Sequence, residues 1–298
     1  MCDTCGCSDT NSVRITRPGK NLPGQDHNIQ EHHSHDHASH QDHTHEHDNP
    51  QDHRENHFHG SDQKHYAGTG HRHENSHSHS HTKTIEVQQD ALSQNNLLAE
   101  YNRGFLEARG IFALNLVSSP GSGKTSLLER TINDLKDRRT LFVIEGDQQS
   151  MNDANRIDAA GAPVIQINTG NGCHLDAGMI RNAIRQLQPS EQSLLFIENV
   201  GNLVCPALFD LGENKRVVII SVTEGDDKPL KYPGMFSTSD LCIINKTDLL
   251  PYVDFDTEKA KEFARRVQPD IEFIETSVRN GDGMDQWYEW LSGSLSAG

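Results

Sequence analysis

The sequence lacks any long hydrophobic run. None of its 298 residues lie in a stretch approaching the roughly 20 apolar residues that a membrane helix needs. Its first residues, MCDTCGCSDT, contain neither the basic nor the apolar segment of a secretory signal. We therefore expect no membrane span and a cytoplasmic protein.

Basic residues are few relative to acidic ones. The chain holds 27 lysines and arginines against 43 aspartates and glutamates, which gives a formal net charge of -16. A nucleic-acid partner would favour a basic patch on the protein surface. We therefore expect no nucleic-acid partner.

The N-terminal quarter is poor in apolar residues and rich in histidine. Of the 19 histidines in the chain, all but one lie between His27 and His81. Such a segment cannot bury enough apolar surface to offset its ordering entropy, so it is predicted to be disordered. Its imidazole clusters are typical of metal buffering, although a solvating linker could have the same composition. The predicted zones are a cysteine motif at 1–8, a disordered His-rich metal-binding tract at 9–84 and a globular domain at 85–298.

Cysteines are also few, and three of the six stand together at the N-terminus, as Cys2, Cys5 and Cys7. Without a secretory signal the thiols should stay reduced, which favours metal binding over disulfides. No apolar core surrounds the three, so packing does not explain the cluster. A flat set of nitrogen and sulfur ligands would suit Ni²⁺ and a tetrahedral sulfur set Zn²⁺, and the spacing does not decide between them.

The globular part alternates short apolar runs with segments of helical periodicity. This alternation predicts an α/β fold: a mostly parallel sheet flanked by helices on both faces. The expected strands are 111–117, 140–144, 164–167, 194–197, 217–222, 241–244 and 271–274, and the expected helices are 90–105, 124–136, 176–187, 257–267 and 284–291.

A phosphate-binding loop is predicted at 118–125, SSPGSGKT, because it follows a predicted strand and opens a predicted helix. Its backbone N–H groups would cradle phosphates, with Lys124 on the β- and γ-phosphates and the Thr125 hydroxyl on Mg²⁺. Ser118 replaces the first glycine of the usual motif, while the later glycines remain. The predicted nucleotide-binding residues here are Gly121, Ser122, Gly123, Lys124, Thr125 and Ser126.

A second nucleotide element, Asn245-Lys246-Thr247-Asp248, directly follows a later predicted strand. In this context Asn245, Lys246 and Asp248 are predicted to bind the base. The Asp248 carboxylate would accept hydrogen bonds from the N1 and N2 donors of guanine, which adenine lacks, so GTP and GDP are the expected ligands. The alternative is that Asp248 merely caps a helix start.

Two acidic residues are predicted to serve Mg²⁺ and catalysis with Lys124 and Thr125. Glu198 ends an apolar strand and begins Glu-Asn-Val-Gly, which is similar to the switch element D-x-x-G of GTPases. Asp147 follows another strand. Mg²⁺ takes oxygen ligands, so both carboxylates suit it, although either one can also cap a loop.

A further set of metal-ligand types lies within the globular domain, at Cys173, His174 and Cys205. Two thiols and one imidazole make an incomplete tetrahedral set, and a symmetric dimer could bring two sets together. Cys205 lies seven residues after Glu198. If the segment after Glu198 moves when the γ-phosphate leaves, hydrolysis would alter metal affinity. Cys242 lies within a strand and is expected to be a small buried hydrophobe.

Taken together, the motifs resemble the HypB family of hydrogenase nickel-incorporation GTPases. The resemblance rests on the N-terminal cysteines, the His tract, SSPGSGKTS, IEGD, CHLDA, ENVGNLVCP, TEGDDKPLKYP and NKTDLLP, and it covers nearly all of 92–291. It implies a P-loop GTPase of the SIMIBI class that hydrolyses GTP with Mg²⁺ and dimerises around nucleotide. It also implies a nickel metallochaperone for [NiFe]-hydrogenase.

The resemblance assigns Cys2, Cys5 and Cys7 to a tight nickel site, and Cys173, His174 and Cys205 to a nickel or zinc site at a dimer interface. The implied partners are a HypA-type maturation factor and the precursor of the hydrogenase large subunit. A urease-type nickel GTPase is the closest alternative. Nickel storage with a regulatory GTPase domain and a signalling GTPase with incidental cysteines are others.

Overall fold

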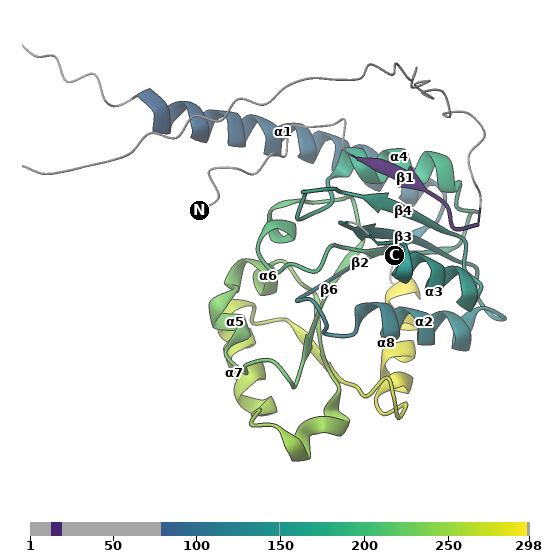
Figure 1. Cartoon of the computed structure of the whole chain (residues 1–298), viewed down its shortest axis with the longest axis vertical. Helices are drawn as coiled ribbons and strands as arrows, with labels where there is room; N and C mark the ends of the chain where they lie inside the picture. Colours follow the sequence, from purple (N-terminus) through teal and green to yellow (C-terminus); the bar gives the residue numbers. More distant parts are fainter. Residues whose placement is uncertain (1–12, 20–78, 149, 297–298) are drawn as a thin grey trace, which may run out of the picture. The chain divides into compact units, whose positions relative to one another are not determined.

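A computed structural model describes residues 13–19, 79–148 and 150–296 of the chain (Figure 1). The predicted metal ligands Cys2, Cys5 and Cys7 lie outside the described residues, as does 20–78 of the His-rich tract. Within the described residues, no helix combines the length and apolar character that crossing a membrane would require.

The core of the described part is one eight-stranded sheet in the order β1-β4-β3-β5-β2-β6-β7-β8. All neighbouring strands are parallel except β1, which pairs antiparallel with β4 at the edge. The predicted mostly parallel sheet is therefore confirmed. The strands are β1 (Arg14–Thr16), β2 (Phe112–Ser118), β3 (Leu141–Asp147), β4 (Val164–Asn168), β5 (Leu194–Glu198), β6 (Lys215–Ser221), β7 (Leu241–Asn245) and β8 (Glu272–Glu275).

Helices cover both faces of this sheet (Figure 1). The α-helices are α1 (His79–Ala108), α2 (Lys124–Leu135), α3 (Asn152–Ala160), α4 (Ala177–Leu187), α5 (Lys228–Lys231), α6 (Pro233–Ser237), α7 (Thr257–Val267) and α8 (Met284–Ser296), and the 3-10 helices are η1 (Cys205–Leu208) and η2 (Thr247–Tyr252). Apolar side chains of α2, α3 and α8 form one buried cluster with one face of the strands. Those of α1 and α4, and of α6 and α7, form two clusters with the other face.

Six elements are missing from the sequence-based prediction: β1, α3 and the short helices α5, α6, η1 and η2. Arg14–Thr16 lie in the tract predicted to be disordered, but they form β1 against Gln166–Asn168 of β4. Three residues are too few to show a periodic pattern. Helix α3 buries only Ala154, Ile157 and Ala160, so its apolar signal is also weak. In addition, α1 begins at His79, before the boundary predicted at residue 85.

The parallel strands place the predicted functional residues at one edge of the sheet. Because β2, β3, β5 and β7 are parallel, the loops that follow them leave from the same edge of the sheet. Ligands bind at this edge in open α/β sheets. Each of these four strands ends in, or is followed by, residues that the sequence predicts to be functional.

Candidate nucleotide and metal sites

The loop between β2 and α2 has the backbone that a phosphate-binding loop needs. Gly121 and Gly123 have φ of 76° and 102°, which favours glycine at both positions. A Cβ at Gly123 would also lie 2.4 Å from the amide nitrogen of Asn245. Ser118, at the first glycine position of the motif, is instead the last residue of a strand. That position therefore needs no glycine in this chain.

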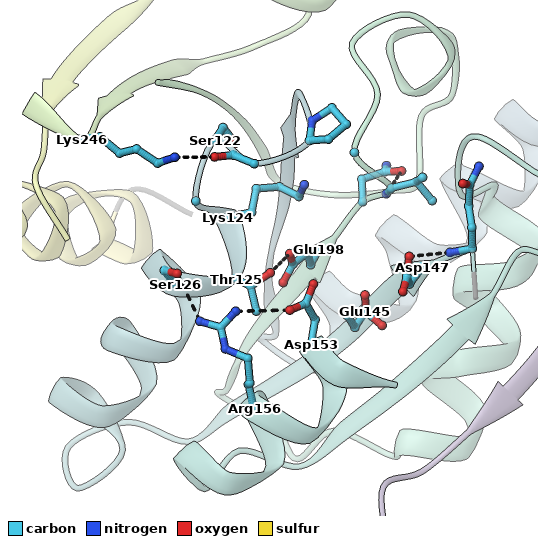
Figure 2. A pocket seen from close by; sticks show the side chains of 18 residues that line it. Ser122, Lys124, Thr125, Ser126, Glu145, Asp147, Asp153, Arg156, Glu198 and Lys246 are labelled. Carbon is cyan, nitrogen blue, oxygen red and sulfur yellow. Dashed lines mark hydrogen bonds and ion pairs between the residues drawn. The ribbon is translucent and has the colours of Figure 1, made fainter. Parts of the chain in front are cut away.

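This loop borders a cavity of about 490 Å³ (Figure 2). Its lining includes all six residues predicted to bind phosphate, together with Asp147, Glu198 and Lys246. Asp248, predicted to bind the base, is not among the lining residues. The remaining lining residues are Pro120, Glu145, Gly146, Gln148, Asp153, Arg156, Asn199, Val200 and Gly201.

Lys124 is buried at the base of this cavity. Its Nζ donates to the hydroxyl of Ser118 at 2.9 Å. Burial lowers the pKa of the ammonium, and the carboxylate of Glu198 opposes that effect. A buried cation with neutral hydrogen-bond partners is suited to bind anionic phosphate oxygens, which restore the interactions that burial removed.

Carboxylates beside Thr125 form the part of the cavity suited to a divalent cation. The Thr125 hydroxyl donates to Oε1 of Glu198 at 2.6 Å. Among the described residues, neither the other oxygen of Glu198 nor Oε2 of Glu145 has a hydrogen-bond partner, and both atoms are buried. Burial, together with the charges of Glu198 and Asp147, raises the pKa of Glu145 to about 9. These oxygen donors fit Mg²⁺, which would supply the missing positive charge.

Asp147 lines the cavity and also holds its own loop. Its carboxylate accepts from the backbone N–H of Gln148 at 2.6 Å and of Ser150 at 3.0 Å, and from the Ser150 hydroxyl at 2.7 Å. These bonds match the loop-capping alternative for this residue. Of the two acidic residues predicted from sequence, Glu198 is the one whose carboxylate accepts a hydrogen bond from Thr125.

Sequence reasoning missed three charged residues of the cavity: Glu145, Asp153 and Arg156. Glu145 is a charged residue inside an apolar strand, and that contrast was the available signal. The other two come from α3, which the sequence did not reveal. The Arg156 guanidinium donates to Ser126 at 3.1 Å and pairs with Glu129 at 2.7 Å.

The segment predicted to bind the base is tied directly to the phosphate-binding loop. The amide of Asn245 donates to the carbonyl of Ser122 at 2.9 Å, and Nζ of Lys246 donates to the carbonyl of Gly121 at 2.7 Å. Lys246 has a φ of 63°, which turns the chain sharply after β7. Phosphate and base elements are thus held in one fixed arrangement.

Asp248 accepts a hydrogen bond from the Ser277 hydroxyl at 2.7 Å. Ser277 belongs to the loop that follows β8. The same loop reaches Asn245, whose Oδ1 accepts from the Thr276 hydroxyl at 3.2 Å. Asp248 is thus oriented by a neighbouring hydroxyl and is not a cap of η2, which has no side-chain cap.

The Glu-Gly-Asp-Asp-Lys segment, for which the sequence alone provides no role, supports the phosphate-binding loop from the other side. The Ser119 hydroxyl donates to Glu224 at 2.6 Å, and Lys228 pairs with the same carboxylate at 3.0 Å. The other Glu224 oxygen accepts from the backbone N–H of Ser221 at 3.1 Å. Glu224 therefore connects β6 to the entry of the loop.

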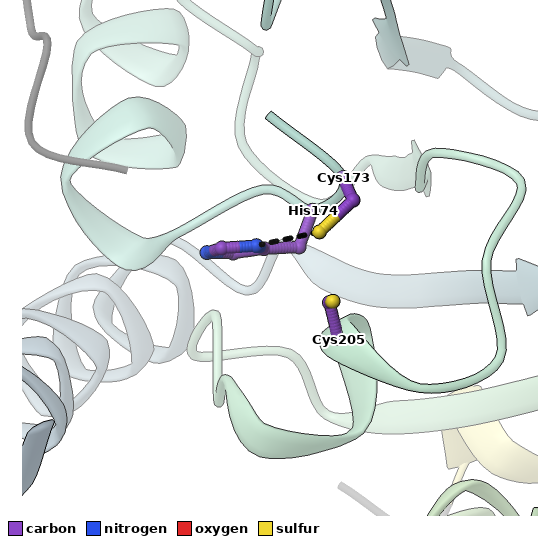
Figure 3. A group of neighbouring side chains, drawn as sticks. All are labelled: Cys173, His174 and Cys205. Carbon is purple, nitrogen blue, oxygen red and sulfur yellow. Dashed lines mark hydrogen bonds between the residues drawn. The ribbon is translucent and has the colours of Figure 1, made fainter. Parts of the chain in front are cut away.

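The three predicted metal ligands of the domain lie together (Figure 3). One ligand atom from each of Cys173, His174 and Cys205 falls within 4.8 Å of the others, and the Cys173 sulfur is 3.8 Å from Nδ1 of His174. Burial lowers the pKa of His174, although Asp176 opposes the shift. The neutral imidazole that this favours is the metal-binding form. Two thiols and an imidazole suit a borderline cation such as Ni²⁺ or Zn²⁺.

The His174 ring is held by stacking on Phe209, with ring centroids 3.9 Å apart. Cys205 opens η1, and Cys173 lies in the loop after β4. Cys242, by contrast, is buried among apolar side chains, and burial raises the pKa of its thiol. It is a core residue, as predicted.

The fold and the cavity define a P-loop nucleotide-binding protein that carries a second, sulfur-rich donor set. Comparison with known proteins agrees: residues 112–275 match the model of the family described as CobW/HypB/UreG, nucleotide-binding domain.

Curated relatives identify the branch of this family. The chain is 60% identical over 209 residues to hydrogenase maturation factor HypB of Azotobacter vinelandii, covering 70% of this chain and 69% of that one. It is 48% identical to HypB of Escherichia coli strain K12 over 295 residues, 98% of each chain. The crystal structure of HypB from Helicobacter pylori in complex with nickel matches with a TM-score of 0.64 and 37% identity, over 68% of this chain and 96% of that one. The chain belongs to the HypB family of hydrogenase maturation factors.

Proposed function

We propose that this protein is a Mg²⁺-dependent GTPase that acts as a nickel metallochaperone for [NiFe]-hydrogenase, coupling GTP binding, hydrolysis and dimerisation to nickel delivery. The observation that carries the proposal is the continuity of one short segment. Glu198 contacts Thr125 in the nucleotide cavity, and Cys205, seven residues later, is a donor of the sulfur-rich set.

In this proposal the nucleotide is held by residues with separate tasks. Lys124 and the N–H groups around Gly121 and Gly123 bind the phosphates, and Asp248 selects guanine. Thr125 and Glu198, with Glu145 or Asp147, hold the cation. When bound there, Mg²⁺ would supply positive charge to offset the negative charge that develops during phosphoryl transfer.

Nickel is the proposed cargo, with Zn²⁺ as the competing ion. The nickel complex solved for the Helicobacter pylori relative supports nickel. Cys173, His174 and Cys205 supply one site and Cys2, Cys5 and Cys7 a second, tighter one. Three donors leave a coordination position open, which a second copy of the chain can fill in a dimer. A HypA-type factor and the hydrogenase large-subunit precursor are the proposed partners, in the cytoplasm.

The decisive experiment measures Ni²⁺ and Zn²⁺ binding to the full chain and to a Cys2/Cys5/Cys7→Ala variant, each with GDP and with a non-hydrolysable GTP analogue. We expect one tight nickel site that the variant lacks and a second site whose affinity depends on the nucleotide. Identical affinity in the two nucleotide states would contradict the coupling, because coupling between two sites must be reciprocal.

Nickel storage is the alternative that the His-rich composition favours. Deleting residues 20–78 tests it. Storage predicts lost nickel capacity with hydrogenase maturation intact at ample nickel, whereas delivery through the tract predicts impaired maturation even then.

A further inference from the structure

Asn199 lines the nucleotide cavity and at the same time contacts a loop that carries metal donors. Its side-chain oxygen accepts from the backbone N–H of Leu175 at 3.3 Å and of Val200 at 3.0 Å. Leu175 directly follows His174. Asn199 is only 1% exposed, so a movement of its side chain must be transmitted to these neighbours rather than absorbed by water.

The nitrogen of the same amide enters a buried polar network. It donates to Oδ1 of Asn115 at 3.3 Å, and the Asn115 amide donates to Glu213 at 2.9 Å. Asn115 is fully buried in β2, and the other residues of this strand are mostly apolar. Burying an amide there is costly unless all its groups are paired, so the network restricts Asn199 to one orientation.

The network ends at the imidazole of His174, on the side away from Leu175 in the chain of contacts. Glu213 pairs with Arg216 at 2.7 Å, and that guanidinium donates to the carbonyl of Phe209 at 2.8 Å. The Phe209 ring stacks on His174. His174 is thus held along two routes that begin at Asn199, one through the backbone of Leu175 and one through the ring of Phe209.

We infer that Asn199 is the positioning residue through which the nucleotide cavity controls the geometry of the Cys173, His174 and Cys205 donor set. The inference rests on the proposed function. A shift of the segment after Glu198 when the γ-phosphate is lost moves Asn199, and the hydrogen bond to Leu175 moves His174 relative to the two thiols. Without the Asn199 amide, both sites still bind their ligands, but the bound nucleotide changes the metal affinity only weakly.

The chain offers a matched control in Asn102 of α1. Its amide donates to the carbonyl of Ala177, the first residue of α4, at 2.9 Å and to that of Leu211 at 3.0 Å. It therefore ties together the segments that carry His174 and Phe209. Asn102 is equally buried but does not line the nucleotide cavity. Replacing Asn102 should therefore weaken metal binding by the donor set by a similar factor with GDP and with a GTP analogue.

The test uses the full chain carrying Cys2/Cys5/Cys7→Ala, titrated with Ni²⁺ alone as the metal. Thiolate-to-nickel charge-transfer absorption then reports on Cys173 and Cys205 and not on the histidine tract. Each protein is titrated with GDP and with a non-hydrolysable GTP analogue. We expect a 5- to 150-fold ratio of nickel affinities in this background, the range typical of coupled sites. With Asn199→Ala the ratio should fall to within about 2-fold of one, and with Asn102→Ala it should persist although both affinities weaken.

A ratio that survives Asn199→Ala overturns the inference and leaves the proposed function standing. Loss of the ratio in both variants also overturns it, since general loosening of the loops would then explain the effect. A ratio of one in the unsubstituted background overturns the proposed coupling and the inference together. Asn199→Ser, which leaves a small polar group in the same space, replaces Asn199→Ala if that variant does not fold and carries the same expectation.

Discussion

Single carboxylates decide most of the chemistry in the nucleotide cavity. Within the described part of the chain, Glu198 and Glu145 each bury one oxygen without a hydrogen-bond partner, although burial of an unpaired carboxylate is costly. Protein groups alone do not satisfy them, and a divalent cation would. The unusual pKa of Glu145 has the same cause.

We expect Glu198→Gln to lower GTP turnover by on the order of 100-fold, because in the proposed mechanism it removes a charge that would hold the cation in the transition state. Steady-state phosphate release measures the turnover. GDP affinity should change only a few-fold. Glu258→Gln, which alters an exposed carboxylate paired with Lys261, is the control and should leave turnover unchanged. Turnover near that of the unsubstituted protein in Glu198→Gln would rule out the proposed role of Glu198.

Asp248→Asn should weaken GDP binding by roughly 100-fold, because an amide oxygen replaces a charged acceptor and an amide N–H faces the guanine donors. Calorimetric titration of GDP measures the loss. Xanthosine diphosphate, whose carbonyl replaces the N2 donor, should bind the variant better than it binds the unsubstituted protein. Equal loss for both nucleotides would mean that Asp248 acts on the fold rather than on the base.

Arg216→Met should lower the free energy of unfolding by about 3–5 kcal/mol, because it leaves the carboxylate of Glu213 buried without its partner. Urea denaturation measures this change. The double variant Arg216→Met/Glu213→Gln should recover much of the loss, since the unpaired charge is gone. A single variant as stable as the unsubstituted protein would show that the pair contributes nothing.

The ion pair of Glu213 and Arg216 also predicts how the free energy of unfolding depends on pH. Burial by itself would raise the pKa of Glu213, but the Arg216 charge and the Asn115 amide hold it below its ordinary value. The folded state then binds fewer protons than the unfolded state, so this stabilisation is complete above about pH 4.5 and is lost as the pH falls further. The unfolding free energy of the double variant should therefore decline less below that pH. Parallel acid titrations followed by circular dichroism compare the two proteins.

Among the elements, α8 shows how a helix remote from the site supports it. Trp287 is fully buried, and its indole N–H donates to the Thr131 hydroxyl of α2 at 2.9 Å. Helix α2 begins at Lys124, so α8 braces the helix whose N-terminus borders the nucleotide cavity. Helix α8 therefore supports the nucleotide cavity indirectly, through its packing and this hydrogen bond to α2.

Trp287→Ala should cost about 3–5 kcal/mol of stability, the usual range for removing a buried large aromatic side chain. Thermal or urea unfolding measures it, and the magnesium dependence of GDP binding by the surviving folded protein should be unchanged. Tyr252→Ala, at a residue 83% exposed, is the control. Equal stabilities of the two variants would contradict the bracing role of α8.

At the scale of the whole molecule, the surface beside the donor set bears on how two copies of the chain would form the proposed dimer. Val204 and Leu208 are 58% and 63% exposed, and they lie on either side of Cys205 in the chain. In the proposed homodimer this apolar surface lies where the incomplete metal set needs further ligands. Assembly and metal binding should therefore be linked.

Leu208→Asp should weaken the dimer formed with nickel and a GTP analogue by at least about 10-fold, because a charge would be desolvated at the interface. Sedimentation velocity measures the dimer, and Tyr252→Asp is the matched exposed control. A dimer of unchanged affinity in Leu208→Asp would place the interface elsewhere.

The sequence by itself determined the features that depend on local spacing. Strand, loop and helix in close succession identified Ser118–Thr125 and Asn245–Asp248, and alternating apolar runs predicted the parallel sheet. Composition alone marked the histidine tract. These inferences needed no knowledge of distant contacts, because a phosphate-binding loop and a buried strand are defined by adjacent residues.

Only the tertiary structure decided which distant residues meet. The sequence indicated that Cys173 and Cys205 are of ligand type, but folding brings their sulfurs together with His174 within one chain. It likewise placed Glu145 beside Glu198 and connected Asn199 to Asn115. The physical reason is that such pairs are joined by sheet order and loop packing, which depend on the sum of many weak contacts over the whole domain rather than on any local pattern.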